Sequence, residues 1–337
     1  MNILLTSAGR RSYLVEYFRR ALIGKGLVHA GNSTMSTALL AADMRIITPL
    51  IYDKDYIRFL IDYCKKYNIS AIIPLFDVDL PILAKAKQMF RKQEIEVVIS
   101  RYEVVKICND KWRTYNFLRK NQIPTPKTYI NFDYVQKKID KKIINFPLII
   151  KPRWGMGSIG IYKVENTNEL EVLYNKSVND IKKSYLKFES KENMEKCIII
   201  QEYLEGIEYG LDVVNDLEEK YTTTFVKRKL AMRSGETDAA ITEYNPTLEK
   251  IGFTLSSNLC HIGVLDVDCV LCGQKPYVLE MNARFGGHYP FSHLAGANIP
   301  EAIIKWLNHE VPNQNVFKID DGVIGIKNIV PIKYDQP

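Results

Sequence analysis

The sequence predicts an α/β protein with an N-terminal parallel-sheet domain followed by an α+β unit in two parts. Over residues 1–105, short apolar runs alternate with amphipathic helical stretches, which is the pattern of parallel βαβ units. Beyond residue 211, apolar and polar residues alternate in the manner of antiparallel strands. Between these regions, a glycine-rich segment directly follows a short apolar strand. With 337 residues, the chain is long enough for two or three domains.

The N-terminal domain, residues 1–105, consists of strands and helices in strict alternation. Its expected strands are 2–6, 27–31, 69–75 and 96–100, and its expected helices are 12–26, 55–68 and 80–93. Sheets of this kind bind ligands at the carboxyl ends of their strands. Two loops are expected at those ends, "TSAGRRS" after the first strand and "FDVDLP" after the third.

These two loops carry four charged residues, each with two interpretations. Arg10 and Arg11 could hold a carboxylate or a phosphate at a helix N-terminus, or they could face solvent there. Asp77 and Asp79 could orient a substrate, or they could cap the helix that begins near Leu80. The residue types alone do not decide between binding and structural roles.

The remainder of the chain is expected to form three segments. Residues 106–126 form a linking helix and a proline-bearing turn, residues 127–210 a smaller lobe with the glycine-rich segment, and residues 211–337 a larger lobe. The larger lobe has expected strands at 211–218, 220–232, 261–271 and 275–283, and an expected helix at 299–310.

The composition excludes several classes of protein. The chain is 46% hydrophobic and 25% charged, and no apolar run approaches the roughly 20 residues of a membrane helix. Its N-terminal charges follow the apolar stretch, the reverse of a secretory signal, so we expect a cytoplasmic protein without a membrane partner. The net charge of +7 favours an anionic small ligand, and no aromatic-interleaved basic stripe indicates nucleic acid.

The six cysteines are scattered, which indicates reduced thiols rather than a disulfide framework. Cys269 and Cys272 form a CxxC, but no second CxxC or spaced histidine pair completes a zinc site. We therefore interpret these two cysteines as positions on a β-hairpin.

The glycine-rich segment "KPRWGMGSIG", residues 151–160, combines flexibility with positive charge. Glycine amides approach a phosphate closely because no Cβ intervenes, and Lys151 and Arg153 would add cations. A surface hairpin between two strands is the alternative interpretation of the same residues.

An acidic cluster near residue 280 is the most informative pattern in the chain. If "GQK" forms a three-residue turn, Asp268 lies directly across from Glu280 on the neighbouring strand. Asn282 then shares a face with Glu280, because side chains two apart on a strand point the same way. Two facing carboxylates repel, and a hard divalent cation such as Mg²⁺ removes that penalty. The alternative interpretation is a charged sheet surface.

Together, the glycine-rich segment, the acidic cluster and the nearby Arg284 supply cations, amides and a metal site, as a nucleoside triphosphate requires. With these residues, the chain resembles the ATP-grasp superfamily, in the branch of carbamoyl phosphate synthase large subunits and biotin carboxylases. "NDKWRTYNFLRKNQIPTPKTY" resembles the entry segment of that family, "IIKPRWGMGSIG" its mobile glycine loop and "IIIQEYLEGIEYGLDV" its interdomain hinge. The resemblance covers nearly the whole chain. It implies a Rossmann-like pre-ATP-grasp domain followed by a two-lobed α+β ATP-grasp domain.

The resemblance assigns roles to individual residues. The implied ATP-binding residues are Lys111, Lys151, Arg153, Gly155, Gly157, Ser158, Gln201, Glu202, Leu204 and Glu208. The implied metal ligands are Asp268, Glu280 and Asn282, with Asp268 standing where several members of the family carry Glu or Gln. The implied catalytic residues are Arg284, Lys151 and Arg233. The implied cofactors are ATP and Mg²⁺, with two ions expected and Mn²⁺ as an alternative.

The resemblance also implies a reaction, in which a ligase activates a small-molecule carboxylate as an acylphosphate and joins it to an amine. Residues 227–246 are expected to border the carboxylate site, with Arg228 near the carboxylate or phosphoryl group and Glu236 near the acceptor, although a flexible exposed loop is the alternative. His288 could act as a base for the amine or could be a packing residue. A homodimer is common among similar proteins.

Two other functions remain open from the sequence. A kinase of the same fold would stop after phosphoryl transfer to a hydroxyl group. A non-catalytic regulator would use ATP only as a signal, but it would not need a complete magnesium set together with Arg284.

Overall fold

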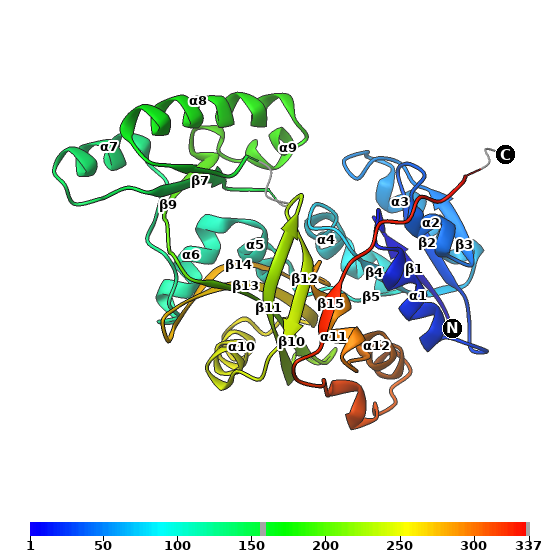
Figure 1. Ribbon diagram of the computed structural model, residues 1–337. Helices are drawn as coiled ribbons and strands as arrows, with labels where there is room; N and C mark the ends of the chain where they lie inside the picture. The colour runs from blue at the N-terminus through cyan, green and yellow to red at the C-terminus, as the bar shows by residue number, and fades with distance from the viewer. Residues whose placement is uncertain (156–159, 335–337) are drawn as a thin grey trace.

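The computed structural model describes residues 1–155 and 160–334, which form three β-sheets with flanking helices (Figure 1). Figure 1 shows the N-terminal sheet at the right, the smaller lobe at the upper left and the largest sheet between and below them. No helix in the described ranges is both long and apolar enough to cross a membrane.

The N-terminal sheet is parallel, with strand order β3-β2-β1-β4-β5. Its elements are β1 (Asn2–Thr6), α1 (Ser12–Ala21), β2 (Val28–Asn32), α2 (Thr37–Ala41), β3 (Met44–Ile47), α3 (Tyr56–Lys66), β4 (Ile69–Pro74), α4 (Leu80–Arg91) and β5 (Glu96–Val97). The predicted alternation is confirmed, while α2 and β3 are additional elements that the sequence pattern does not mark.

Two helices, not one, link this sheet to the rest of the chain. They are α5 (Tyr102–Asn109) and α6 (Lys111–Lys120), so the single linking helix expected from residue 106 is wrong. Asp110 between them has an extended backbone, and its carboxylate accepts hydrogen bonds from the amides of Trp112 and Arg113 at 3.0 and 3.3 Å. This N-cap ends one helix and starts the next, and it fixes where Lys111 begins α6.

The smaller lobe has a four-stranded sheet with order β6-β9-β7-β8. Its elements are β6 (Thr128–Tyr129), α7 (Phe132–Asp140), β7 (Leu148–Pro152), β8 (Tyr162–Val164), α8 (Thr167–Lys183), α9 (Leu186–Ser190), η1 (Met194–Lys196) and β9 (Ile198–Glu202). Val135, Trp154 and Ile198 belong to a core that contains only residues of this lobe.

The larger lobe has a six-stranded antiparallel sheet with order β14-β13-β10-β11-β12-β15. Its elements are β10 (Ile207–Asn215), β11 (Tyr221–Arg233), β12 (Glu236–Thr242), α10 (Pro246–Leu259), β13 (Gly263–Cys272), β14 (Lys275–Asn282), α11 (Tyr289–Leu294), α12 (Ile299–Leu307), η2 (Gln314–Phe317) and β15 (Ile324–Ile326). Residues 227–246 are mostly a hairpin of β11 and β12, so the flexible loop considered for them is wrong.

The N-terminal sheet and the larger lobe share their hydrophobic cores. One buried cluster joins Leu4 of β1 to Leu211 of β10, and a second joins Phe18 of α1 to Phe285 after β14. These two parts of the chain therefore stabilise each other by common burial, whereas the smaller lobe packs on its own.

Candidate nucleotide and metal site

A cavity of about 310 Å³ lies between the smaller lobe and the sheet of the larger lobe. Strands β7 and β9 supply one wall, and β10, β13 and β14 supply the other. We call it the first cavity. The predicted site residues that line it are Lys111, Lys151, Gly155, Gln201, Glu202, Leu204, Glu208, Asp268 and Glu280. Gly157 and Ser158 lie outside the described residues.

The acidic cluster has the predicted register, although its turn differs from the prediction. Asp268 lies opposite Glu280 in the β13–β14 pair. Cys272 pairs with Lys275, so the turn contains two residues, and a bulge after Asp268 restores the expected register. Both carboxylates thus point to the same face of the sheet, beside the first cavity.

Two lysines from other elements face this pair of carboxylates. The Lys111 ammonium lies 2.5 Å from the Gly155 carbonyl oxygen and 3.5 Å from a Glu280 carboxylate oxygen. Lys151 is buried, and this burial lowers its pKa to about 8, against the opposing effect of Glu280. Burial raises the pKa of Glu280, but Lys111 and Lys151 outweigh that effect, so the pKa lies below its usual range.

Lys229 of β11 is a third lysine at the site, and the sequence analysis missed it. Its ammonium lies 2.6 Å from Asp268 and 3.8 Å from Glu208. Burial lowers the pKa of Lys229, but the ion pair with Asp268 outweighs burial and holds the pKa above its ordinary value. Alternation places Lys227 and Lys229 on one face of a strand, but that pattern does not indicate their partners on neighbouring strands.

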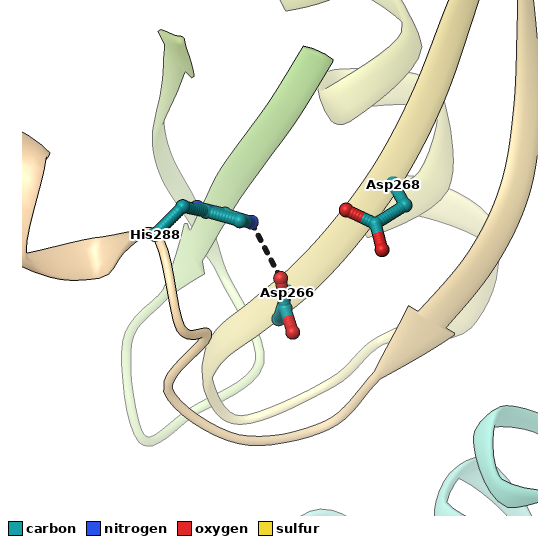
Figure 2. Close-up of side chains that lie close together, drawn as sticks. All are labelled: Asp266, Asp268 and His288. Atoms are coloured by element: carbon teal, nitrogen blue, oxygen red, sulfur yellow. Dashed lines mark ion pairs between the residues drawn. The ribbon is translucent and has the colours of Figure 1, made fainter. Parts of the chain in front are cut away.

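Asp266 of β13 is the second missed residue, and three side chains converge on it. It lies opposite Asn282, whose amide nitrogen is 3.3 Å away. Arg284 forms an ion pair with it, and His288 Nε2 lies 2.5 Å from its carboxylate. Figure 2 shows the His288 ring directed at Asp266. Gly286 passes so close that an added Cβ would lie 2.5 Å from the Asp266 carboxylate. Asp266 therefore organises the segment that follows β14.

His288 is enclosed by carboxylates on both sides. Its Nδ1 lies 3.3 Å from Asp212 of β10, and Asp212 also pairs with the fully buried Lys227. Burial and Lys227 lower the pKa of His288, but Asp266 and Asp212 outweigh them and raise it. Because both ring nitrogens face carboxylates, the geometry supports a positioning role for His288 and leaves no nitrogen directed at an amine.

Three predicted arginines have partners away from the first cavity. Arg153 makes two hydrogen bonds to Asp110, at 2.7 and 2.6 Å, and so ties the end of β7 to the cap of α6. Arg228 bonds to Glu243 at 3.0 Å, and Arg233 pairs with Asp238. None of these arginines lines the first cavity or the second cavity described below, so the structure does not bring them to the site as expected.

Arg284, by contrast, connects the two parts of the fold at the site. Its guanidinium bonds to Asp77 after β4 at 2.8 and 3.1 Å, and to Asp266 on the other side. Asp77 thus has a specific partner. Asp79 is buried and accepts hydrogen bonds from Thr6, Ser7 and Tyr56, and it makes no side-chain cap of α4.

A second cavity of about 440 Å³ adjoins the first. Its walls come from the loop after β1, the loop after β4, the β11–β12 turn and the segment after β14. Arg10, Arg11, Glu236 and His288 line this cavity, which is therefore bordered by both signs of charge. Arg11 also donates to the Phe285 carbonyl oxygen at 2.5 Å, which joins the loop after β1 to the larger lobe.

The residues present fit a hard divalent cation. Asp268, Glu280 and Asn282 offer oxygen atoms from two neighbouring strands, which is the donor type that Mg²⁺ prefers. Lys229 lies 2.6 Å from Asp268 and Lys111 lies 3.5 Å from Glu280, so each carboxylate is paired with a lysine. Each carboxylate of the pair thus has a cationic partner that offsets the cost of placing the two negative charges side by side.

The first cavity thus lies between a smaller α+β lobe that carries Lys151 and an antiparallel sheet that carries Asp268, Glu280 and Lys229, a set of charges suited to a nucleotide with a metal ion. The PylC-like N-terminal domain family matches residues 3–98, and the ATP-grasp domain family matches residues 108–288. Because the second match spans more than half of the chain, the protein belongs to the ATP-grasp family. The predicted family and fold class are both confirmed.

Relatives of known type share low identity with this chain. It is 20% identical over 274 residues to the carbamoyl phosphate synthase large chain of Pseudothermotoga lettingae, across 79% of this chain and 23% of the relative. It is 21% identical over 235 residues to the carbamoyl-phosphate synthase of Methanobrevibacter smithii, across 65% of this chain and 58% of the relative. The chain therefore spans about a quarter to three fifths of the length of these ligases.

Solved structures share the fold. Biotin carboxylase from Campylobacter jejuni, solved as a β,γ-ATP complex, has a TM-score of 0.74 at 17% identity, over 96% of this chain and 74% of that one. The L-amino acid ligase from Bacillus licheniformis has a TM-score of 0.70 at 16% identity, over 95% of this chain and 76% of that one. The similarity extends through the N-terminal sheet and both lobes.

Proposed function

We propose that the chain is an ATP-dependent carboxylate–amine ligase that forms an amide bond on a small anionic metabolite through an acylphosphate. The observation that carries this proposal is that the two cavities adjoin at Asp268 and Glu280, which line both. A nucleotide in one cavity and an acid in the other would therefore meet at the acidic pair.

The first cavity has the chemistry of a nucleotide site. In this proposal, Gln201, Glu202 and the Leu204 backbone contact adenine, and Glu208 accepts hydrogen bonds from the ribose. Lys111, Lys151 and the Gly155 segment then face the phosphates. The order of these residues along the cavity wall, from β9 into β10, supports this placement.

In the proposed reaction, a carboxylate oxygen of the acid attacks the γ-phosphorus, and the bond to the β-phosphate oxygen breaks to release ADP. The amine then attacks the acyl carbon, loses a proton and displaces inorganic phosphate. The first step brings two anions together, and the second develops negative charge on the acyl oxygen and the departing phosphate, so cationic side chains near the reacting atoms lower both barriers. Lys111 and Lys151 line the first cavity and Arg284 lines the second, which supports this role for them in the proposal.

Mg²⁺ bound by Asp268, Glu280 and Asn282 would supply Lewis-acid stabilisation of the phosphates. The chain's own contribution is to hold these oxygen donors in register across the β13–β14 ladder. Arg284 is itself held by Asp77 and Asp266, so its guanidinium has little freedom to move away from the second cavity. Such fixed charges need little reorganisation during the reaction.

The test is ADP release from ATP and Mg²⁺ with paired libraries of carboxylic acids and amines. A ligase releases ADP rapidly only when both an acid and an amine are present. The Glu280→Gln variant should lose about 100-fold or more in rate, because it removes one metal-facing charge. The Glu218→Gln variant is the control, since Glu218 is exposed and pairs only with Lys220 among the described residues.

The result also separates the alternatives. ADP release that requires a hydroxyl compound and no amine would indicate a kinase of the same fold. Unchanged ADP release in Glu280→Gln would contradict the assigned site.

A further inference from the structure

Lys229 of β11 lies where the two cavities meet. The residues that line both are Lys229, Met232, Gly235, Asp268 and Glu280. Lys229 is the cation of this set. A phosphoryl group that leaves ATP in the first cavity and reaches an acid in the second must pass this junction, because these residues form the boundary.

The fold holds Lys229 firmly at this junction. In the β10–β11 ladder, Tyr209 pairs with Arg228, which places Lys229 beside Glu208 on the same face of the sheet. The Lys229 side chain is 7% exposed, and its ammonium lies 2.6 Å from Asp268. Arg228 next to it bonds to Glu243 and lines neither cavity. The alternation of side chains along β11 therefore directs Lys229 at the acidic cluster and Arg228 away from it.

This ion pair conflicts with a metal at the same carboxylate. A divalent cation on Asp268 would take the oxygen that Lys229 contacts, and two cations a few ångströms apart repel strongly in a partly buried site. Metal binding must therefore loosen the contact between Lys229 and Asp268. The other acidic neighbour, Glu208, is 3.8 Å away and is assigned to the ribose in the proposed function.

We propose that Lys229 is a catalytic residue for phosphoryl transfer: it neutralises Asp268 in the ligand-free protein and moves onto the transferred phosphoryl group when the metal arrives. This role rests on the proposed function. As the bond from phosphorus to ADP breaks and the bond to the acid oxygen forms, the ammonium stabilises the phosphoryl oxygens and keeps its own protons. Lys229 would also keep the site neutral until nucleotide and metal bind.

The experiment compares Lys229→Met and Lys229→Arg with Lys220→Met, which changes an exposed lysine directly before the same strand. Mn²⁺ binding to the nucleotide-free protein is measured by electron paramagnetic resonance. Lys229→Met should bind Mn²⁺ about tenfold more tightly than wild type, because the competing cation is gone. Lys229→Arg and Lys220→Met should bind Mn²⁺ like wild type.

ADP release is the second measurement on the same proteins. Lys229→Met should lose about 100-fold or more in kcat, with the KM for ATP within about threefold of wild type. Wild-type Mn²⁺ affinity or wild-type ADP release in folded Lys229→Met would overturn the role of Lys229 alone. If wild-type protein released no ADP with any acid and amine, the proposed function would fail instead, and the catalytic role of Lys229 with it.

Discussion

Lys151 is the residue at which protonation should most directly control nucleotide binding. It lies on β7, 6% exposed, and burial lowers its pKa to about 8 from an ordinary value of 10.5. Below that pH the side chain carries the charge that phosphates attract, and above it the charge is lost. ATP affinity should therefore fall as the pH rises through about 8.

The measurement is calorimetric titration of ATP with Mg²⁺ between pH 7 and 9.5, chosen to bracket the value of about 8. Lys151→Arg is the matched control, because a guanidinium stays protonated across this range. Its ATP affinity should change much less with pH than that of wild type. An identical pH profile for both proteins would show that Lys151 does not carry the effect.

At the scale of the element, β10 requires a glycine at position 210, where the strand passes close to the His288 ring. A Cβ at Gly210 would lie 2.5 to 2.8 Å from atoms of the His288 ring, which is held between Asp212 and Asp266. Gly210→Ala should lower the free energy of unfolding by about 1–3 kcal/mol, because the ring cannot move without breaking these contacts.

Chemical denaturation of Gly210→Ala and Gly287→Ala provides the comparison. A Cβ at Gly287 would meet only ordinary contacts, 3.6 Å or more from Glu236. Gly287→Ala should therefore stay within about 0.5 kcal/mol of wild type. Equal stability of the two variants would mean that the His288 ring is not fixed as described.

In the β13–β14 hairpin, the sequence predicted the pairing of the two carboxylates correctly and the length of the turn incorrectly. An expected three-residue turn placed Asp268 opposite Glu280, and the two residues do pair in the β13–β14 ladder. The turn was predicted one residue too long, and a bulge compensates. Asp266 and Lys229 were missed because their importance lies in partners on other strands, which no local pattern encodes.

The prediction of helix boundaries failed where it depended on a capping interaction. The pattern of residues 106–121 predicted one helix, yet the Asp110 side chain caps a new one. Aspartate is a common surface residue as well as a cap, so its role depended on the later pairing with Arg153, 43 residues away. Because Arg153 bonds to Asp110, it does not line the first cavity, where the sequence analysis expected it to bind ATP.

At the scale of the whole molecule, the site depends on contacts between the N-terminal sheet and the larger lobe. Arg284 bonds to Asp77, which is 207 residues away in sequence and follows β4. Such a contact could not be predicted from one sequence, although the fold class and the loops at the strand ends could. The N-terminal domain thus helps to orient Arg284, the proposed catalytic arginine, as well as to border the second cavity.

Asp77→Asn should therefore affect both stability and turnover. Loss of one partner of this buried pair should cost about 3–5 kcal/mol of unfolding free energy, and the loosened arginine should lower kcat. Asp62→Asn, which breaks an exposed pair with Arg58, should change the free energy by no more than about 1 kcal/mol. Thermal unfolding and ADP release measure the two effects, and wild-type behaviour of Asp77→Asn in both would contradict this link.

The most direct test of the account is calorimetry of a non-hydrolysable ATP analogue, with Mg²⁺ and with EDTA, on wild type and on Asp268→Asn/Glu280→Gln. Mg²⁺ should tighten wild-type binding by about tenfold or more, and the double variant should lose this dependence. Wild-type binding of equal strength in EDTA, or an undiminished Mg²⁺ effect in the double variant, would contradict it.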